Sequence, residues 1–600
     1  MNISTSVRSC PHRRGTRAAV TRNLAGICVL LALAFSTPGV QQSASAGLST
    51  YQPVTDAMLR QPSPYDWLMY SRTYDAQRFS PLKQINTRNV GRLGLAWSRG
   101  LPAGVTETIP LVYGGVMYVV VPGAKVQALD ASNGDLIWEY VRPLEIKGAG
   151  EQARSKNLAI YGDLIYYTAP DSYVIALDVR DGSVRWQAQT GKRGHTSGPL
   201  VIEGQVISGG TCGGSRDGCY IAAHDALTGA ERWRFYTTPA PGEPGDESWG
   251  GAELQYRQAS TWGLPGSYDP DKKLIYWGIA NPMPDLRIQR HGGDPAATSR
   301  YAPADLYSNS TVALKPDTGK LAWYYQHLPG DDADLDHTHE RTLVRTSIKP
   351  DPRYVKWINP KIKIGETRDV AVTLPEGGGV FVLDSATGEF LWATPFPFDT
   401  PEMLLRDIDV QTGRTEINWD LVTKQPNQPR IVCYWNTRSY WPTAYHPGTN
   451  SLYTSYIDNC REITGMTGRD SWRVIPRPGS DPKELTGLAR INLSTGEVMR
   501  FDVGRAPGNG ALLATAGNLV FHGDMSRRFR AFDAATGKRL WETVLGGNVS
   551  VSTITYAVNG RQYVAVMTGD NLKVPELLGV VPELELPRGH NEIYVFALMD

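Results

Sequence analysis

Short runs of alternating apolar and polar residues recur along the chain, often as pairs joined by a tight turn. In most pairs the first run ends at or near an acid, a glycine follows within a few residues, and the second run closes on a large ring, as in ALDASNGDLIW and AFDAATGKRLW. Alternation with a period of two is typical of a β-strand, and a glycine between two such runs predicts a hairpin. The copies end at Trp138, Trp186, Trp233, Trp323, Trp392, the degraded Arg500, and Trp541.

The spacing of these hairpins predicts a β-propeller. The turn glycines Gly134, Gly182 and Gly229 are 48 and 47 residues apart, close to the length of one four-stranded sheet. Wider gaps later in the chain leave room for insertions or for a sheet without the motif. A lone hairpin cannot bury its apolar face, so repetition implies sheets stacked on one another. We predict an all-β, eight-bladed β-propeller with tryptophan docking motifs, in which the run LGLAW (93–97) pairs with the final run EIYVFALM.

The first 46 residues differ from the rest of the chain. They contain five arginines and no acid, then an apolar run, then Ala-Ser-Ala, which is typical of a cleaved secretory signal peptide. The apolar run is too short to span a bilayer. Residues 47–600 are expected to form a single propeller domain, in a periplasmic protein with no stable membrane anchor. Without the leader, 56 basic residues face 60 acidic ones, a balance that does not favour nucleic acid as a partner.

Four cysteines remain after the leader, an even number suited to an oxidising compartment. Proximity along the chain suggests the disulfides Cys212–Cys219 and Cys433–Cys460. The CxxCH motif for attaching a c-type haem does not occur in the sequence.

The densest chemical signal is the segment GDDADLDHTHE (330–340), where four aspartates fall within six residues. Carboxylates this close repel one another unless water solvates them or a cation neutralises them. The alternating acids Asp334 and Asp336 could share a hard metal ion, although a solvated acidic loop would explain the same residues. His337 and His339 are expected to be bystanders, because hard oxygen sites rarely recruit imidazole.

Several longer segments make the chain similar to the pyrroloquinoline-quinone (PQQ)-dependent alcohol dehydrogenases of the methanol dehydrogenase large-subunit type. They include DAQRFSPLKQINTRNVGRLGLAW, GSYDPDKKLIYWGIANP and TYAVNGRQYVAVMTG, and the resemblance covers essentially all of residues 47–600. It implies an eight-bladed propeller in which an aspartate takes the alcohol proton, hydride passes to PQQ, and a metal ion polarises the quinone carbonyl. Because no haem is built in, electrons would pass to a separate cytochrome c.

The resemblance also implies a catalytic base and metal ligands. Asp334 matches the catalytic aspartate, and Asp336 matches the extra acid that marks the lanthanide-using branch of the family. Asn281 in IANP matches the metal-binding asparagine. Asp334 would be both base and metal ligand, and Asp336 and Asn281 would be the other ligands. All three offer oxygen donors, as a calcium or lanthanide ion requires.

Five further positions match residues that bind the quinone. Lys156 stands where the family usually has arginine, so the charge is kept and the bidentate fork is lost. Trp262 matches the tryptophan beneath the quinone ring, one residue off the usual spacing; an ordinary core tryptophan is the other interpretation. The full set is Glu107, Lys156, Thr196, Thr211 and Trp262.

Three departures from the family pattern leave a second function open. The family's metal-ligating glutamate falls on Gly214, its lysine or arginine near the quinone carbonyl falls on Glu376, and its asparagine falls on Ser439. Asp217, in the same loop, is the candidate to replace the missing glutamate. The chain is therefore expected to be an exported dehydrogenase of a small alcohol, or else a related propeller that has lost redox chemistry and serves in binding or assembly.

Overall fold

The structure is a computed structural model that describes residues 51–145, 150, 153–465 and 471–599. All of these residues belong to one compact unit, Ala44–Asp600. The predicted signal peptide, residues 1–46, lies outside the described residues.

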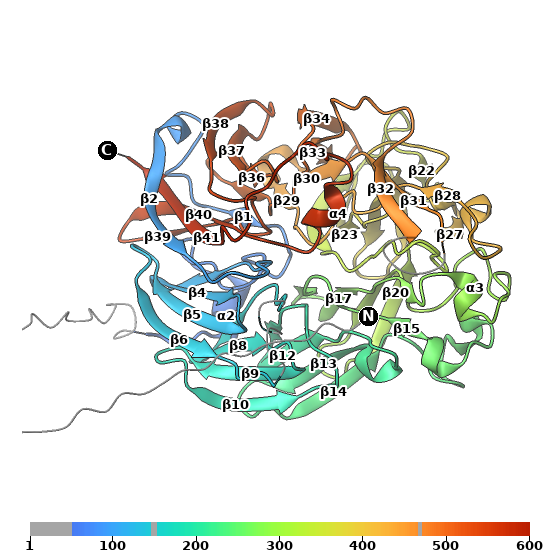
Figure 1. Cartoon of the computed structure of the whole chain (residues 1–600), viewed down its shortest axis with the longest axis horizontal. Coiled ribbons are helices and arrows are strands. Elements are labelled where there is room, and N and C mark those ends of the chain that lie inside the picture. Colours follow the sequence, from blue (N-terminus) through green and yellow to red (C-terminus); the bar gives the residue numbers. More distant parts are fainter. Residues whose placement is uncertain (1–50, 146–149, 151–152, 466–470, 600) are drawn as a thin grey trace, which may run out of the picture. The chain divides into compact units, whose positions relative to one another are not determined.

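Strands dominate the described part of the chain, and most belong to eight antiparallel-rich sheets of four or five strands (Figure 1). In the first half of the chain they are β3–β6 (Leu111–Tyr113, Val116–Val121, Lys125–Asp130, Leu136–Val141), β7–β10 (Ala159–Tyr161, Leu164–Thr168, Tyr173–Asp178, Val184–Gln189), β11–β14 (Leu200–Ile202, Gln205–Gly209, Tyr220–Asp225, Glu231–Tyr236) and β16, β17, β19, β20 (Ser267–Asp269, Leu274–Gly278, Ser310–Leu314, Leu321–Gln326).

The second half of the chain continues the pattern. The sheets are β21, β23, β24, β25, β22 (Thr342–Ile348, Glu366–Thr373, Val380–Asp384, Phe390–Thr394, Trp357–Ile358), β29, β30, β33, β34 (Ala444–His446, Ser451–Ile457, Thr486–Asn492, Val498–Gly504), β1, β35–β38 (Phe79–Ser80, Leu513–Thr515, Leu519–Gly523, Arg528–Asp533, Arg539–Val544) and β39, β40, β41, β2 (Ile554–Val558, Arg561–Thr568, Glu592–Leu598, Leu93–Gly100).

Smaller elements decorate these sheets. The short strands are β15 with β18 (Gln258–Ala259, Pro282–Met283), β26 with β27 (Leu405–Asp409, Arg414–Ile417) and β28, β31, β32 (Arg430–Val432, Asn459–Ile463, Trp472–Pro476). The helices are α2 (Asp56–Arg60), α3 (Arg287–Arg290) and α4 (Val574–Leu577), with 3₁₀ turns η1 (Val90–Arg92), η3 (Arg216–Gly218), η4 (Asp246–Trp249), η5 (Leu254–Tyr256), η6 (Trp419–Leu421) and η7 (Pro447–Thr449). None of the helices in the described ranges is long and apolar enough to cross a membrane.

The two ends of the described chain meet in one sheet. Strand β2 pairs antiparallel with β41, with Trp97 opposite Val595, and Figure 1 shows the blue strand beside the red ones. The pairing of 93–97 with the final apolar run, expected from the sequence, is confirmed.

The tryptophan at the end of one repeat lies over the turn glycine of the next. A Cβ added to Gly182 would stand 2.6 Å from the Trp138 ring, and one added to Gly229 would stand 2.5 Å from Trp186. The Trp138 indole also donates a hydrogen bond to the Val179 carbonyl at 2.9 Å. Each ring therefore joins its own hairpin to the next one along the chain. The same arrangement holds for Trp97 over Gly134, Trp233 over Gly319 and Trp323 over Gly388, and Phe501 covers Gly537 beside the degraded repeat.

Burial follows the position of a strand within its sheet. Strand β4 is buried at every residue, whereas in β6 only Trp138 is buried and the other positions are exposed or partly exposed. The continuous apolar sequence of β4 (VMYVVV) suits a strand covered on both faces, and the mixed sequence of β6 suits an outer strand.

Both disulfides expected from the sequence are confirmed. Cys212 and Cys219 are bonded with their Cα atoms 4.7 Å apart, and Cys433 and Cys460 with theirs 4.2 Å apart.

Candidate functional site

The topology gathers the residues expected from the sequence, together with Tyr440 and Lys573, at one end of the sheets. Several lie in segments that lead into the first strand of a sheet, before β3, β7, β11, β16, β21 and β29; others follow the second strand. Because first and second strands are antiparallel, the start of one and the end of the other lie at the same edge of the sheet. The first group holds Glu107, Lys156, Thr196, Trp262, Asp334, Asp336 and Tyr440; the second holds Thr211, Asn281, Glu376 and Lys573.

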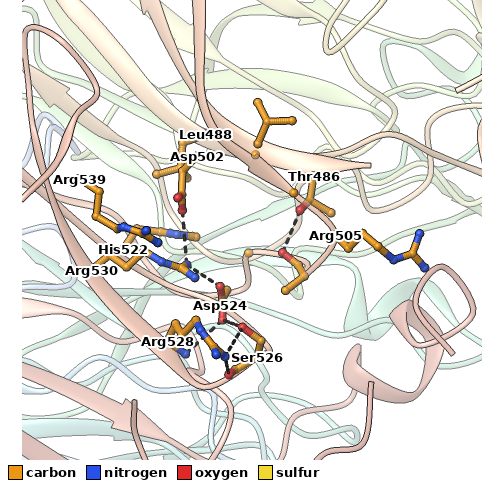
Figure 2. A pocket seen from close by; sticks show the side chains of 15 residues that line it. Thr486, Leu488, Asp502, Arg505, His522, Asp524, Ser526, Arg528, Arg530 and Arg539 are labelled. Carbon is orange, nitrogen blue, oxygen red and sulfur yellow. Dashed lines mark hydrogen bonds and ion pairs between the residues drawn. The ribbon is translucent and has the colours of Figure 1, made fainter. Parts of the chain in front are cut away.

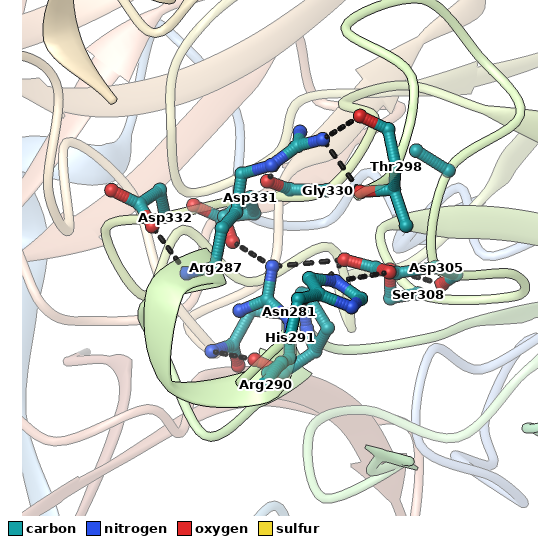
Figure 3. Close-up of polar contacts among 12 residues, drawn as sticks. Asn281, Arg287, Arg290, His291, Thr298, Asp305, Ser308, Gly330, Asp331 and Asp332 are labelled. Carbon is teal, nitrogen blue, oxygen red and sulfur yellow. Dashed lines mark hydrogen bonds and ion pairs between the residues drawn. The ribbon is translucent and has the colours of Figure 1, made fainter. Parts of the chain in front are cut away.

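Two of the four clustered aspartates are structural. Asp331 accepts hydrogen bonds from the backbone amides of Ala333 (2.8 Å) and Leu335 (2.7 Å), which folds the loop back on itself. Asp332 accepts from the amide of Arg287 at 2.5 Å, at the start of α3 (Figure 3), and from the guanidinium of Arg430 at 2.5 Å.

A buried cluster of charged side chains, Asp305, Arg290 and His291, packs against this loop. Asp305 accepts from Arg290 Nη2 at 2.9 Å, and its other oxygen lies 3.1 Å from His291 Nε2 (Figure 3). Arg290 also donates to the Asp331 carbonyl at 2.8 Å. Burial alone would raise the pKa of Asp305, but the positive charge of Arg290 and the bond with His291 outweigh it and lower that pKa to about 2.

Asp334 and Asp336 are the two acids of the cluster that face the site. Asp334 adopts a left-handed backbone conformation (φ 59°), its side chain is 31% exposed, and its Oδ2 lies 3.6 Å from Arg461 Nη1. Asp336 is buried and accepts from Trp262 Nε1 at 2.9 Å and from the backbone amide of Asn281 at 3.1 Å. One carboxylate therefore joins the residue expected beneath the quinone to the residue expected to bind the metal.

The acids of the site repel one another. Burial and then the charge of Asp334 raise the pKa of Asp336 to about 8. The same two causes raise the pKa of Asp285 to about 7; this residue, not anticipated from the sequence, accepts from Asn281 Nδ2 at 2.9 Å. That hydrogen bond occupies the amide nitrogen of Asn281, so its Oδ1 is left to serve as the donor atom. Closely placed carboxylates of this kind favour a cation between them.

A second polar group surrounds Glu107. Its carboxylate accepts from Lys156 Nζ and from the Tyr440 hydroxyl, each at 2.5 Å, and from the Leu572 amide at 3.2 Å. Burial would raise the pKa of Glu107, but the charge and hydrogen bonds of Lys156 and Tyr440 prevail and lower it. Burial lowers the pKa of Lys156, partly offset by Glu107.

Trp262 links this group to the acids. Its ring lies 5.9 Å from that of Tyr440, nearly perpendicular, and Lys156 Nζ lies 5.8 Å from its centroid. The Trp262 carbonyl accepts from Thr196 Oγ1 at 2.9 Å, and Thr196 Oγ1 lies 3.3 Å from Thr211 Oγ1. The residues expected around the quinone thus form one connected set, to which the structure adds Tyr440.

The three departures from the family pattern lie in different surroundings. Gly214 is exposed with a φ of 82°, and Asp217 in η3 is exposed as well. Glu376 is buried, and its amide donates to the Asp336 carbonyl at 3.1 Å. Ser439, which precedes Tyr440 in the sequence, is buried. Among the described residues there is no group of three or more His, Cys, Asp or Glu side chains arranged to hold a metal ion.

The two histidines of the acidic segment are fully buried. Burial lowers the pKa of His337 to about 3 and that of His339 well below its usual value, so both rings are neutral. His337 Nδ1 lies 2.9 Å from Asn309 Nδ2, in the supporting network beneath the site.

A cavity of about 250 Å³ lies between β33, β34, β36 and β37, away from these residues (Figure 2). Its wall carries Arg530, which pairs with Asp524 at 2.5 Å and Asp502 at 3.4 Å. These charges satisfy one another, so the cavity is a poor candidate for catalysis.

Comparison with known proteins connects these features to a family. The family model described as "PQQ: glucose/ethanol/alcohol dehydrogenase, beta-propeller domain" matches residues 67–395 and 483–564. The quinohemoprotein alcohol dehydrogenase ADH-IIG of Pseudomonas putida is 32% identical, covering 90% of this chain and 77% of its own length. A quinohemoprotein alcohol dehydrogenase of Comamonas testosteroni is 30% identical over 91% of this chain and 78% of its own.

Solved structures agree with the sequence matches. A europium-containing methanol dehydrogenase superposes with a TM-score of 0.76 at 27% identity, over 90% of this chain and 99% of that one. The all-β fold described above is therefore a β-propeller. With a family model covering more than half of its residues and relatives aligned over most of its length, the chain belongs to the PQQ-dependent quinoprotein alcohol dehydrogenases.

Proposed function

We propose that this protein is an exported, periplasmic enzyme that oxidises a small alcohol with PQQ and one calcium or lanthanide ion, and passes the electrons to a cytochrome c. The observation that carries the proposal is the position of Asp336, which touches both Trp262 and Asn281. Two named relatives support the finer points: one, from Thauera butanivorans, is a 1-butanol dehydrogenase (cytochrome c), and the methanol dehydrogenase structure contains europium.

We further infer that the eight sheets of four or five strands are the blades of the propeller. The tryptophan rings that cover the next turn glycine would then be the docking contacts between blades. Closure of β2 on β41 supports this count, because it joins a strand near the start of the described chain to the last strand in one sheet.

The residues around Trp262 fit a planar, acidic cofactor. Lys156 and the hydroxyls of Thr196 and Thr211 offer hydrogen-bond donors, and the Trp262 indole offers an apolar face. Close to Tyr440 in the sequence, Ser439 Oγ and the side-chain amide of Asn436 are buried without a hydrogen-bond partner among the described residues, as expected of groups that bind a polar ligand. When bound, PQQ would supply the two-electron acceptor and the metal ion would act as Lewis acid.

For the metal, Asn281, Asp334 and Asp336 offer oxygen donors. Two acids bring more negative charge than one, and a higher ligand charge favours a trivalent lanthanide over calcium. Asp285 adds a fourth oxygen-rich side chain next to Asn281.

Asp334 is the residue best placed to take the alcohol proton. It is the more exposed of the two facing acids, so a substrate hydroxyl can reach it. Arg461 Nη1 lies 3.6 Å from Asp334 Oδ2 and helps to hold the carboxylate in place.

The test is Asp334→Asn, assayed by dye reduction over a panel of alcohols with PQQ and either calcium or a light lanthanide supplied. Removing the base should lower kcat by roughly 10²–10⁴-fold. Asp271→Asn, which changes an exposed turn aspartate remote from the site, is the matched control and should keep full activity. Full activity of Asp334→Asn would refute the assignment of the base.

The alternative is a propeller of the same family that serves in binding or assembly. Gly214 and Glu376 favour it, because the first removes a donor and the second reverses a charge. A wild-type protein that neither binds PQQ nor oxidises any alcohol of the panel would support this alternative.

A further inference from the structure

Lys573 and Glu376 form a buried pair that the proposed function does not use. Lys573 lies at the start of α4 and Glu376 between β23 and β24, yet Nζ and Oε1 are 3.8 Å apart. Their side chains are 18% and 1% exposed, and Glu576 Oε2 stands 3.6 Å from the same ammonium. Burial on this scale is uncommon for lysine and glutamate, so the pair calls for an explanation.

The pair adjoins both polar groups of the site. The Glu376 amide donates to the Asp336 carbonyl, and the amide of Leu572, the neighbour of Lys573, donates to Glu107. The charge of Lys573 also acts on Asp334, Asp336 and Lys156. Lys573 and its counter-ion therefore adjoin both the acids and the Glu107 group.

The geometry leaves the ammonium available to a ligand. The two carboxylate oxygens that pair with Nζ lie at 3.6 and 3.8 Å, beyond hydrogen-bond distance. Neither oxygen of Glu376 has a hydrogen-bond partner in the described residues. A pair whose only task was stability would be expected to close to a hydrogen bond, because burying two charges is repaid only by good geometry. The Trp435 ring, 4.7 Å from Nζ, holds the ammonium from another direction.

We infer that Lys573 is a cofactor-binding residue, anchored by Glu376, whose ammonium donates a hydrogen bond to an oxygen of the bound quinone. This inference rests on the proposed function. It explains why a carboxylate at position 376 is compatible with an anionic cofactor: the cation has moved to a different segment of the chain, and Glu376 has become its counter-ion. The site then carries two ammonium groups, Lys156 and Lys573, for an acidic ligand.

The experiment measures the affinity for PQQ itself, by quenching of tryptophan fluorescence at a fixed calcium concentration, independently of turnover. The double variant K573M/E376Q removes both charges of the pair together, so Glu376 is not left as a buried carboxylate without its cation. Its affinity should fall by roughly ten- to hundredfold, the value of a hydrogen bond from a charged donor. K573R, which keeps the charge, should bind within a few-fold of wild type.

The matched control is K356M. Lys356 also lies over an indole (4.9 Å from Trp357) and pairs with an acid, Asp399, at 2.8 Å, but it is exposed and remote from the site. Its loss should leave PQQ affinity unchanged. The swapped variant E376K/K573E tests the pairing directly and should bind PQQ more tightly than K573E alone.

The outcomes separate the two proposals. If wild type binds PQQ and the folded K573M/E376Q variant, checked by its urea midpoint, binds it equally well, the role of Lys573 is refuted while the proposed function stands. If wild type does not bind PQQ, the proposed function fails and the inference fails with it.

Discussion

The contact between Trp138 and Gly182 gives the sharpest test of how the sheets are held together. Gly182 has a φ of 72°, and a Cβ at this position would stand 2.6 Å from Trp138 Cε3. Gly182→Ala therefore adds a methyl group where no space exists. The ring cannot move freely, because its indole nitrogen is tied to the Val179 carbonyl.

The magnitude can be separated into two parts. An alanine with positive φ costs about 1–2 kcal/mol, of which about 0.4–1 kcal/mol is regained because the unfolded chain becomes less flexible. Overpacking against the ring adds about 1–3 kcal/mol. Gly560→Ala is the matched control, since Gly560 has nearly the same φ, 77°, and no atom within 4 Å of its would-be Cβ.

The assay is equilibrium urea unfolding of both variants and wild type, with a common slope. Gly182→Ala should be less stable than Gly560→Ala by about 1–3 kcal/mol. Equal destabilisation of the two variants would mean that the ring contact contributes nothing specific, and the account of stacked repeats would lose its main support.

Three further outcomes are expected. Asp336→Ala should weaken lanthanide-supported dye reduction more than calcium-supported reduction; equal losses would argue against Asp336 as the acid that selects a trivalent ion. Asp305→Asn should lower the free energy of unfolding by about 3–5 kcal/mol at pH 6, because it leaves Arg290 buried without its partner. The pKa of Asp305 is depressed to about 2 in the folded state, so its ionised carboxylate stabilises the fold fully when the pH is above the ordinary aspartate pKa, and this stabilisation is lost as the pH falls toward 2. The difference in unfolding free energy between wild type and Asp305→Asn should therefore shrink by about 1 kcal/mol between pH 6 and pH 3. A constant difference would contradict the assignment. Replacing Cys433 and Cys460 by alanine should cost about 2–4 kcal/mol in urea unfolding under non-reducing conditions, and no change would show that the bridge adds no stability.

Local patterns were enough to predict the hairpins, the closing pair of strands and both disulfides. Each of these depends on residues close in sequence or on a repeat that can be read directly, as with the rings that precede Gly182 and Gly229. The acidic segment itself pointed to Asp336, and the resemblance added Asn281 and Trp262, each of which the structure places in contact with Asp336.

Other site residues had no local signature. Tyr440 reaches Glu107 from 333 positions away, so only the folded chain reveals the hydrogen bond. Lys573 follows the last strand but one, β40, in a segment without a motif. Its partner Glu376, considered alone, is only a reversal of the positive charge that the family has at this position. Asp285 was the one omission with a visible signal, because it stands four residues after Asn281 in the same short segment.

The pairing of β2 with β41 has a consequence for the order of assembly. The sheet that carries Lys573 is completed by strands from both ends of the described chain, Leu93–Gly100 and Glu592–Leu598. Contacts so distant in sequence form late, because the entropy of closing a long loop opposes them until the intervening sheets are in place. The Glu107 cluster also draws on Leu572, near the end of the chain. A nascent chain therefore lacks the complete set of residues proposed to bind the quinone, and capture of the cofactor there would be a final, post-synthetic step that reports whether the whole molecule has closed.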